Sequence, residues 1–189
     1  MKKSDDRRKI ILDMIPKGVK KVLDIGSRGD IFKEKYSVVT IDNLQKSSIK
    51  QDLNLNQKLN FQDNKFDLVV INQILEHLNY VEEIISESKR VSKKYLLVGL
   101  PNEVVYSLRI KFLLGKIEQA GYQRYGHKHR FNIEEIEKFI KEFFGNYEFK
   151  KYWGAFTGAK FLPDKIKAFL ANNLPSLFAK EVYYLIKIK

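Results

Sequence analysis

The sequence contains no cysteine and only three histidines among its 189 residues. Without cysteine the chain can form no disulfide, no thiolate metal site and no cysteine nucleophile. It also has no apolar run approaching the ~20 residues of a membrane-spanning helix, so no transmembrane segment is expected. Its charged start, MKKSDDRRKI, lacks the apolar stretch of a secretory signal. These absences predict a cytoplasmic protein, while peripheral contact with a membrane stays open.

Two common nucleotide-binding fingerprints are missing as well. The segment KVLDIGSRGD, residues 21–30, has the composition of a buried strand that runs into a glycine-containing loop. Its two glycines, Gly26 and Gly29, stand three positions apart, which matches neither G-x-G-x-x-G nor G-x-x-x-x-G-K-[ST]. The local pattern therefore does not identify what this loop binds.

Positive charge is present in excess, with 35 Lys and Arg against 23 Asp and Glu and a formal net charge of +12. Residues 106–189 hold 16 basic against 8 acidic residues, whereas residues 1–105 hold 19 against 15. A basic face favours anionic partners such as nucleic acid, phospholipid headgroups or phosphorylated substrates. An ordinary solvated surface explains the same excess equally well.

Short apolar segments predict five strands in the first half of the chain, at residues 21–25, 37–41, 49–51, 66–71 and 95–98. The strongest of them, DLVVI and YLLVG, hardly alternate between apolar and polar residues, which is typical of a sheet covered on both faces. Between these two, residues 73–91 carry apolar side chains at helical spacing. A strand, a helix and a strand in this order predict a parallel crossover. We therefore expect an α/β sandwich of the Rossmann-like kind.

The other predicted helices lie at both ends of the chain. A short entry helix is expected between Ser4 and Pro16, and basic amphipathic helices over residues 103–119 and 162–174. A further helix begins at Asn132, with Glu135 three positions on as in a capping box and Gly145 as its stop.

Two late segments, residues 147–153 and 183–188, alternate well enough to be an antiparallel pair of strands. The expected sheet is thus mostly parallel, with about seven strands. No repeat or low-complexity linker divides the chain, so we expect a single domain over residues 1–189. Residues 1–102 should form its cofactor-binding half, and residues 103–189 its substrate-side helices and last strands.

Polar residues follow the predicted parallel strands where each one ends. In an open parallel sheet, ligands bind beyond these carboxyl ends. The residues in question are Asp24 and Gly26, Asp42 and Asn43, Asp52 and Leu53, Asn72 and Gln73, and Asn102. An ionised carboxylate can accept hydrogen bonds from both hydroxyls of a ribose, which suits Asp42. Asp52 can accept the exocyclic amine of an adenine while Leu53 covers the ring, and Gly26 allows close approach of the backbone.

Five segments in this order resemble class I S-adenosylmethionine-dependent methyltransferases, in particular the broad group that includes quinone-biosynthesis and glycan-pathway enzymes. They are VLDIG, VVTID, QDLN, FQDNKFDLVVINQILEHL and ESKRVSKKYLLVGLPN, all within residues 18–102. The resemblance continues weakly through GHKHRF. It implies S-adenosyl-L-methionine as cofactor and methyl transfer to a small-molecule, lipid or glycan acceptor.

The resemblance also implies which residues hold that cofactor. Asp24, Gly26 and the loop of Ser27, Arg28 and Gly29 would surround its methionine part. Asp42 would bind the ribose, Asp52 with Leu53 the adenine, and Asn72 would lie near the sulfonium. Asn43, next to Asp42, is expected to contact the cofactor as well. The loop departs from the family pattern, because Arg28 and Asp30 occupy two of its usual glycine positions. Gly26 and Asp42 are only 16 positions apart, so the first crossover should be very short.

Methyl transfer from a sulfonium is an in-line displacement, so alignment of the acceptor is the main catalytic task. A general base helps only where an acceptor hydroxyl must lose its proton. His127 and His129 are the candidate bases, because histidine titrates near neutrality and both lie in the segment expected to cover the pocket. Packing within a loop would explain both histidines too, and helix packing would explain Glu76 and His77. No metal site is expected.

The charge leaves other partners open. Lysines beside apolar residues in the two basic helices have the form of an interfacial anchor on an anionic membrane, although ordinary core faces give the same pattern. They are Lys111, Lys116, Lys160, Lys165 and Lys167, beside Phe112, Leu113, Phe161, Leu162 and Phe169. A nucleic-acid methyltransferase is an alternative, but no N/D-P-P-[YF] stretch supports it. A non-catalytic methyltransferase-like binding subunit is a second alternative, suggested by the altered loop.

Overall fold

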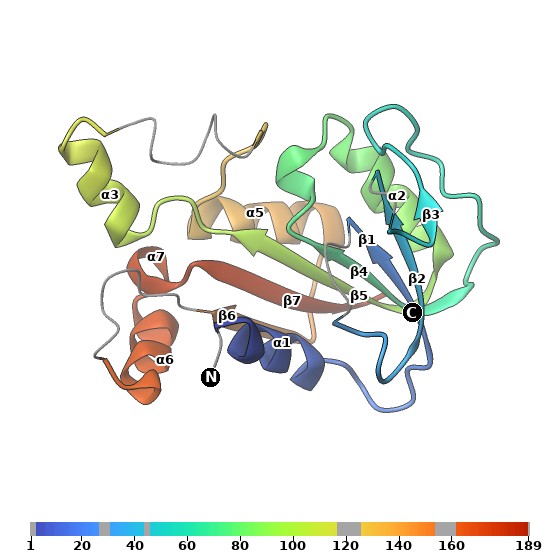
Figure 1. Ribbon diagram of the computed structural model, residues 1–189, viewed down its shortest axis with the longest axis horizontal. Coiled ribbons are helices and arrows are strands. Elements are labelled where there is room, and N and C mark those ends of the chain that lie inside the picture. The colour runs from blue at the N-terminus through green and yellow to red at the C-terminus, as the bar shows by residue number, and fades with distance from the viewer. Residues whose placement is uncertain (1–2, 27–30, 44–45, 117–125, 154–161, 189) are drawn as a thin grey trace.

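A seven-stranded sheet runs through the centre of the computed structural model, which describes residues 3–26, 31–43, 46–116, 126–153 and 162–188. The strand order is β3-β2-β1-β4-β5-β7-β6 (Figure 1). The strands are β1 Lys21–Ile25, β2 Ser37–Asp42, β3 Ile49–Lys50, β4 Phe66–Asn72, β5 Ser92–Pro101, β6 Phe149–Trp153 and β7 Glu181–Lys187. The helices are α1 Lys3–Asp13, η1 Leu75–His77, α2 Val81–Val91, α3 Tyr106–Leu113, α5 Ile133–Phe144, α6 Asp164–Asn173 and α7 Pro175–Phe178.

Strands β1 to β5 pair in parallel, and β7 runs antiparallel to both β5 and β6. The predicted fold class, a mostly parallel sheet with an antiparallel pair at its end, is therefore confirmed. Chain order reverses between β1 and β4, so the carboxyl ends of β1, β2 and β4 meet at the topological switch point where open α/β sheets bind ligands.

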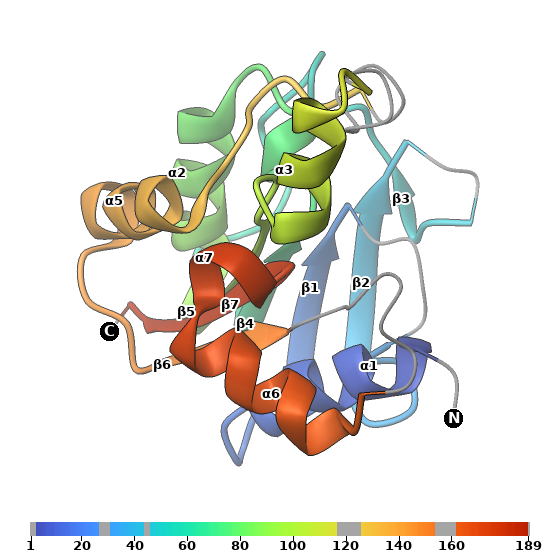
Figure 2. The same ribbon diagram turned by 90° about the vertical axis from the view of Figure 1, so that its left-hand side faces the viewer.

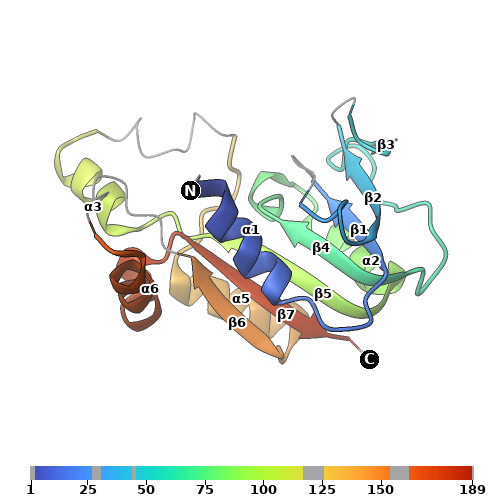
Figure 3. The ribbon, with the colours of Figure 1, turned by 60° about the horizontal axis from the view of Figure 1, so that its bottom comes forward.

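Helices cover both faces of the sheet (Figures 1 and 3). Successive strand residues point to opposite faces, so β4 places Val69 and Ile71 in one core cluster and Leu68 and Val70 in the other. The first cluster includes side chains from α2 and α5, and the second includes side chains from α1. Burial on both faces explains why the strand segments are almost continuously apolar.

Two sequence-predicted helices need correction, whereas the expectation for the first crossover holds. The helix expected over residues 73–91 is divided into the 3₁₀ turn η1 and helix α2, because Leu78 is extended between them. The helix expected over residues 103–119 is the shorter α3, which buries none of its residues. The first crossover is as short as expected: the described residues 31–36 form turns, and Phe32 fills the core there.

The capped helix is confirmed in detail. The Asn132 side chain accepts a hydrogen bond from Glu135 N at 2.9 Å, while the Glu135 carboxylate accepts one from Asn132 N at 2.9 Å. The helix ends at Gly145, whose φ is +73°. This cap fixes where α5 starts, and therefore how residues 126–131 approach the sheet.

Asp67 lies at the amino end of β4, far from the ligand-binding rim, and has a structural role there. Its Oδ2 accepts hydrogen bonds from Lys21 N at 2.9 Å and Lys20 N at 3.0 Å. The bond from Lys21 N is the main cause that holds the pKa of Asp67 below its ordinary value, with Lys20 N and nearby lysines adding to it. The carboxylate thus ties the start of β1 to β4.

We expect Asp67→Asn to lower the free energy of unfolding by about 1 kcal/mol at pH 7, because charge-assisted hydrogen bonds become neutral ones. A lowered folded-state pKa stabilises the protein fully above the ordinary aspartate pKa of about 3.9, and this stabilisation is lost progressively as pH falls from there through the lower folded-state pKa. Urea unfolding at pH 7 and pH 3 measures the difference. Asp13→Asn, at an exposed position, is the control, and a deficit that persists unchanged at pH 3 would contradict the assignment.

Candidate functional site

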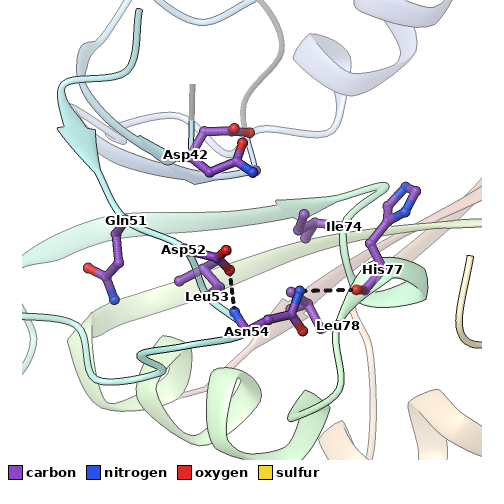
Figure 4. Close-up of a pocket in the computed structure, with 10 residues that line it drawn as sticks. Asp42, Gln51, Asp52, Leu53, Asn54, Ile74, His77 and Leu78 are labelled. Carbon is purple, nitrogen blue, oxygen red and sulfur yellow. Dashed lines mark hydrogen bonds between the residues drawn. The ribbon is translucent and has the colours of Figure 1, made fainter. Parts of the chain in front are cut away.

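A cavity of about 210 Å³ opens at the carboxyl ends of β1, β2 and β4 (Figure 4). Its walls come from four separate parts of the chain, which the parallel sheet brings to one rim. The lining residues are Gly26, Asp42, Asn43, Gln51, Asp52, Leu53, Asn54, Ile74, His77 and Leu78. Five of them, Gly26, Asp42, Asn43, Asp52 and Leu53, are residues that the sequence assigned to the cofactor.

Two carboxylates and one apolar side chain form the part of the cavity that follows β2 and β3. Asp42 ends β2 and is only 8% exposed, and its carbonyl oxygen accepts a hydrogen bond from Gln51 N at 3.0 Å. Asp52 is exposed, and its Oδ1 accepts a hydrogen bond from Asn54 N at 2.8 Å. Leu53 is buried beside them. This set offers acceptors for hydroxyl or amine donors next to an apolar surface.

Gly26 forms the turn after β1, with φ at +73°. Its N–H donates to Ile41 O at 2.8 Å, which holds the turn against β2. A Cβ on Gly26 would lie 2.6 Å from Ile74 Cγ1, closer than carbon atoms can approach. Both the backbone angle and the contact with Ile74 therefore require glycine at this position.

The opposite part of the cavity comes from the segment around η1, which sequence reasoning did not assign to the cofactor. Asn54 connects it to the β3 side: its Oδ1 accepts from Asn79 N at 2.8 Å, and its Nδ2 lies 3.4 Å from His77 O (Figure 4). Ile74 and Leu78 provide apolar surface. No local pattern marks Asn54 or Ile74, because their roles depend on contacts between distant segments.

Other predicted residues lie elsewhere. Asp24 is buried within β1 and Asn72 ends β4, and neither lines the cavity. Asn72 Oδ1 is buried, accepts no hydrogen bond from the described residues, and occupies the space that a side chain at Gly99 would need. Ser27, Arg28 and Gly29 lie outside the described residues, as do Lys160 and Phe161.

The two histidines predicted as bases have different surroundings. His127 Nδ1 is hydrogen-bonded to the Glu103 carboxylate, and its ring centre lies 4.6 Å from that of His77. His129 Nε2 donates to Leu78 O at 2.9 Å. His129 also lines a second cavity of about 420 Å³, with Phe131, Phe139 and Phe143. Both rings therefore contact a residue of the rim cavity, His127 through His77 and His129 through the backbone of Leu78.

The sheet order, the antiparallel last strands and a rim cavity with acids after β2 and β3 define a class I S-adenosylmethionine-dependent methyltransferase fold. The chain belongs to the family described as methionine biosynthesis protein MetW, whose model matches residues 31–133, more than half of its length. Membership of this family supports the predicted class. Comparison with curated protein sequences found no significant match.

Solved structures agree with this class. The chain is similar to a SAM-dependent methyltransferase from Archaeoglobus fulgidus, with 21% identity, a TM-score of 0.64 and coverage of 97% of this chain and 93% of that one. A SAM-dependent methyltransferase from Thermotoga maritima is 16% identical, with a TM-score of 0.64 and coverage of 96% of this chain and 87% of that one. One from Mesorhizobium loti is 14% identical, with a TM-score of 0.62 and coverage of 95% of this chain and 96% of that one. At these identities the similarity shows the shared fold. Among the described residues, no helix is both long and apolar enough to cross a membrane.

Proposed function

We propose that the rim cavity binds S-adenosyl-L-methionine and that the protein transfers its methyl group to a small-molecule, lipid or glycan acceptor. The observation that carries this proposal is the arrival of Asp42, Asp52 and Leu53 from different strand ends at one cavity. A carboxylate that can accept from a diol, a second carboxylate that can accept from an amine, and an apolar side chain that can cover a ring together fit an adenosine.

Each residue then has a chemical task. Asp42 would accept hydrogen bonds from the two ribose hydroxyls, and Asp52 would accept one from the adenine amine while Leu53 covers the ring. Gly26 would let the backbone approach the methionine part. When bound, the cofactor supplies an electrophilic methyl group on a sulfonium. The chain's own contribution is to align an acceptor with that group and to exclude water from it.

The acceptor side of the site contains the residues next to His77. His127 is hydrogen-bonded to Glu103 and lies against His77, which lines the cavity. If the acceptor is a hydroxyl, a base placed here can take its proton during attack. His129 is the less favourable of the two predicted bases, since it lines the other cavity.

Calorimetric titration with S-adenosyl-L-methionine tests the cofactor assignment directly. We expect one molecule bound per chain, and no binding at millimolar cofactor would overturn the proposal. Methyl transfer is then measured with labelled cofactor against panels of small-molecule, lipid and glycan acceptors. Binding without turnover on any acceptor would favour a non-catalytic binding subunit.

We also propose that the end of the molecule formed by α3 and α6 contacts an anionic lipid surface (Figures 1 and 2). Large apolar side chains are exposed on these helices, including Leu113 at 87% and Phe169 at 64%. Lysines flank them: Lys111 and Lys116 in and after α3, Lys165 and Lys167 in α6. Apolar side chains among lysines are complementary to the surface of a bilayer with anionic headgroups.

Vesicle sedimentation tests this contact. We expect binding to vesicles containing phosphatidylglycerol and much weaker binding to pure phosphatidylcholine. Combining Leu113→Glu with Phe169→Glu should lower the partition coefficient at least about tenfold, because each apolar side chain no longer enters the interface. Leu55→Glu, at an 84% exposed leucine after β3, is the matched control. Equal binding by the double variant, or salt-sensitive binding to RNA instead of vesicles, would contradict the proposal.

A further inference from the structure

Three side chains that can bind a metal ion converge beside the rim cavity. Glu76 and His77 lie on η1, and His127 belongs to the segment that precedes α5. One ligand atom from each lies within 4.8 Å of the others. Glu76 is 1% exposed and the His127 side chain 14% exposed, so the cluster is largely shielded from water.

The surroundings orient both rings. His127 Nδ1 is hydrogen-bonded to the Glu103 carboxylate, and His77 Nδ1 lies 3.4 Å from Gly126 O. An acceptor beside each Nδ1 favours the tautomer with its proton there, which leaves the Nε2 lone pair for a ligand. A carboxylate or carbonyl behind a histidine in this way is the usual outer support of a metal-binding imidazole.

The backbone fixes the two segments to each other. Glu76 O accepts hydrogen bonds from Lys128 N at 2.7 Å and His129 N at 3.2 Å, and His129 Nε2 donates to Leu78 O. These bonds hold the GHKHRF segment, residues 126–131, against η1, although about fifty positions separate the two segments in the sequence. These hydrogen bonds position Glu76, His77 and His127 relative to one another without using the atoms that would bind the metal.

We propose that Glu76, His77 and His127 bind a divalent transition-metal ion of the Zn²⁺ type. Two imidazoles and one carboxylate are a ligand set that Zn²⁺ accepts while keeping a further coordination position open. Two mostly buried carboxylates, Glu76 and Glu103, match the +2 charge of such an ion. This assignment departs from the sequence-based expectation of no metal, which rested on the scarcity of histidine and cysteine.

The position of the site gives the ion a task. His77 also lines the rim cavity, so an acceptor aligned with the cofactor would lie near the open coordination position. An ion there would bind an acceptor oxygen and lower the pKa of its hydroxyl, in place of a general base. This task rests on the proposed function, whereas ion binding itself does not.

Titration of the full-length protein with Zn²⁺, after dialysis against chelator and without cofactor, tests the site. We expect one ion per chain, with affinity reduced at least about tenfold in His77→Ala and His127→Ala. Glu103→Gln should weaken binding by about 10-fold to 100-fold, the usual effect of losing an outer carboxylate. His129→Ala is the comparison: it removes the third histidine, two positions from His127, and one hydrogen bond between the two segments but no ligand atom, so the loss of affinity should be clearly smaller than in His77→Ala or His127→Ala.

X-ray absorption of the Zn²⁺-loaded wild-type protein provides a readout that needs no variant, and should show two imidazole nitrogens and at least one oxygen ligand. Absence of stoichiometric binding, equal losses in all three histidine variants, or an oxygen-only shell would overturn the proposal. Cofactor binding is measured separately in the presence of chelator. Failure of the metal site and failure of the cofactor site are therefore distinguished.

Discussion

Asp42→Ala is expected to weaken S-adenosyl-L-methionine binding about 100-fold. The substitution removes the two carboxylate oxygens that we propose accept from the ribose hydroxyls, and each charge-assisted hydrogen bond is typically worth 1.5–3 kcal/mol. A loss of about 3 kcal/mol corresponds to about 100-fold in the dissociation constant. Because Asp42 is only 8% exposed, water cannot easily replace the lost acceptors.

The comparison among variants makes this result specific. Asp42→Asn retains one carbonyl acceptor and should fall between wild type and Asp42→Ala. Asp13→Ala removes an exposed carboxylate at the end of α1 and should leave the cofactor affinity unchanged. Isothermal calorimetry gives the affinities, and circular dichroism confirms that each variant is folded. If Asp42→Ala bound the cofactor as tightly as wild type, the ribose would have to lie elsewhere.

The part of the rim cavity that follows β2 and β3 could be predicted because strand ends are encoded locally. β1 was predicted at its observed bounds, and β2 to within one residue, since short apolar runs specify buried parallel strands. Residues that directly follow such strands must arrive at one rim, which is why Asp42 and Asp52 were found together at the cavity. That prediction required only two things, the parallel arrangement of the strands and the residue at which each strand ends.

The part of the site around η1 and His127 could not be predicted in the same way. Helical spacing continues from residue 73 to residue 91, yet the chain is extended at Leu78 and Asn79 N bonds to Asn54 instead. The interactions of His127 with Glu103 and His77 join segments far apart in the sequence, so neither leaves a local signal. Helix α3 shows the same limit, because its apolar residues were expected to be inward and none is buried.

Gly26→Ala is expected to lower the free energy of unfolding by about 3 kcal/mol. An alanine at φ +73° costs about 1–2 kcal/mol, because its Cβ crowds the following carbonyl oxygen. The same Cβ would lie 2.6 Å from Ile74 Cγ1 and 2.7 Å from Ile74 Cβ, and overpacking of this kind costs a further 1–3 kcal/mol. Ile74 lines the rim cavity, so its displacement should weaken cofactor binding too.

Gly18→Ala separates the two causes. Gly18 has a φ of +88° but no atom within 4 Å of the added Cβ, so only the backbone cost of about 1–2 kcal/mol should appear in urea unfolding. The excess for Gly26→Ala then measures the contact with Ile74. Adding Ile74→Ala, which removes Cγ1 and Cδ1 but keeps Cβ, should recover part of that excess. Equal losses at Gly18 and Gly26, with cofactor affinity unchanged, would mean that the turn after β1 can move away from Ile74. In that case close packing at Gly26 would not be what shapes the cavity.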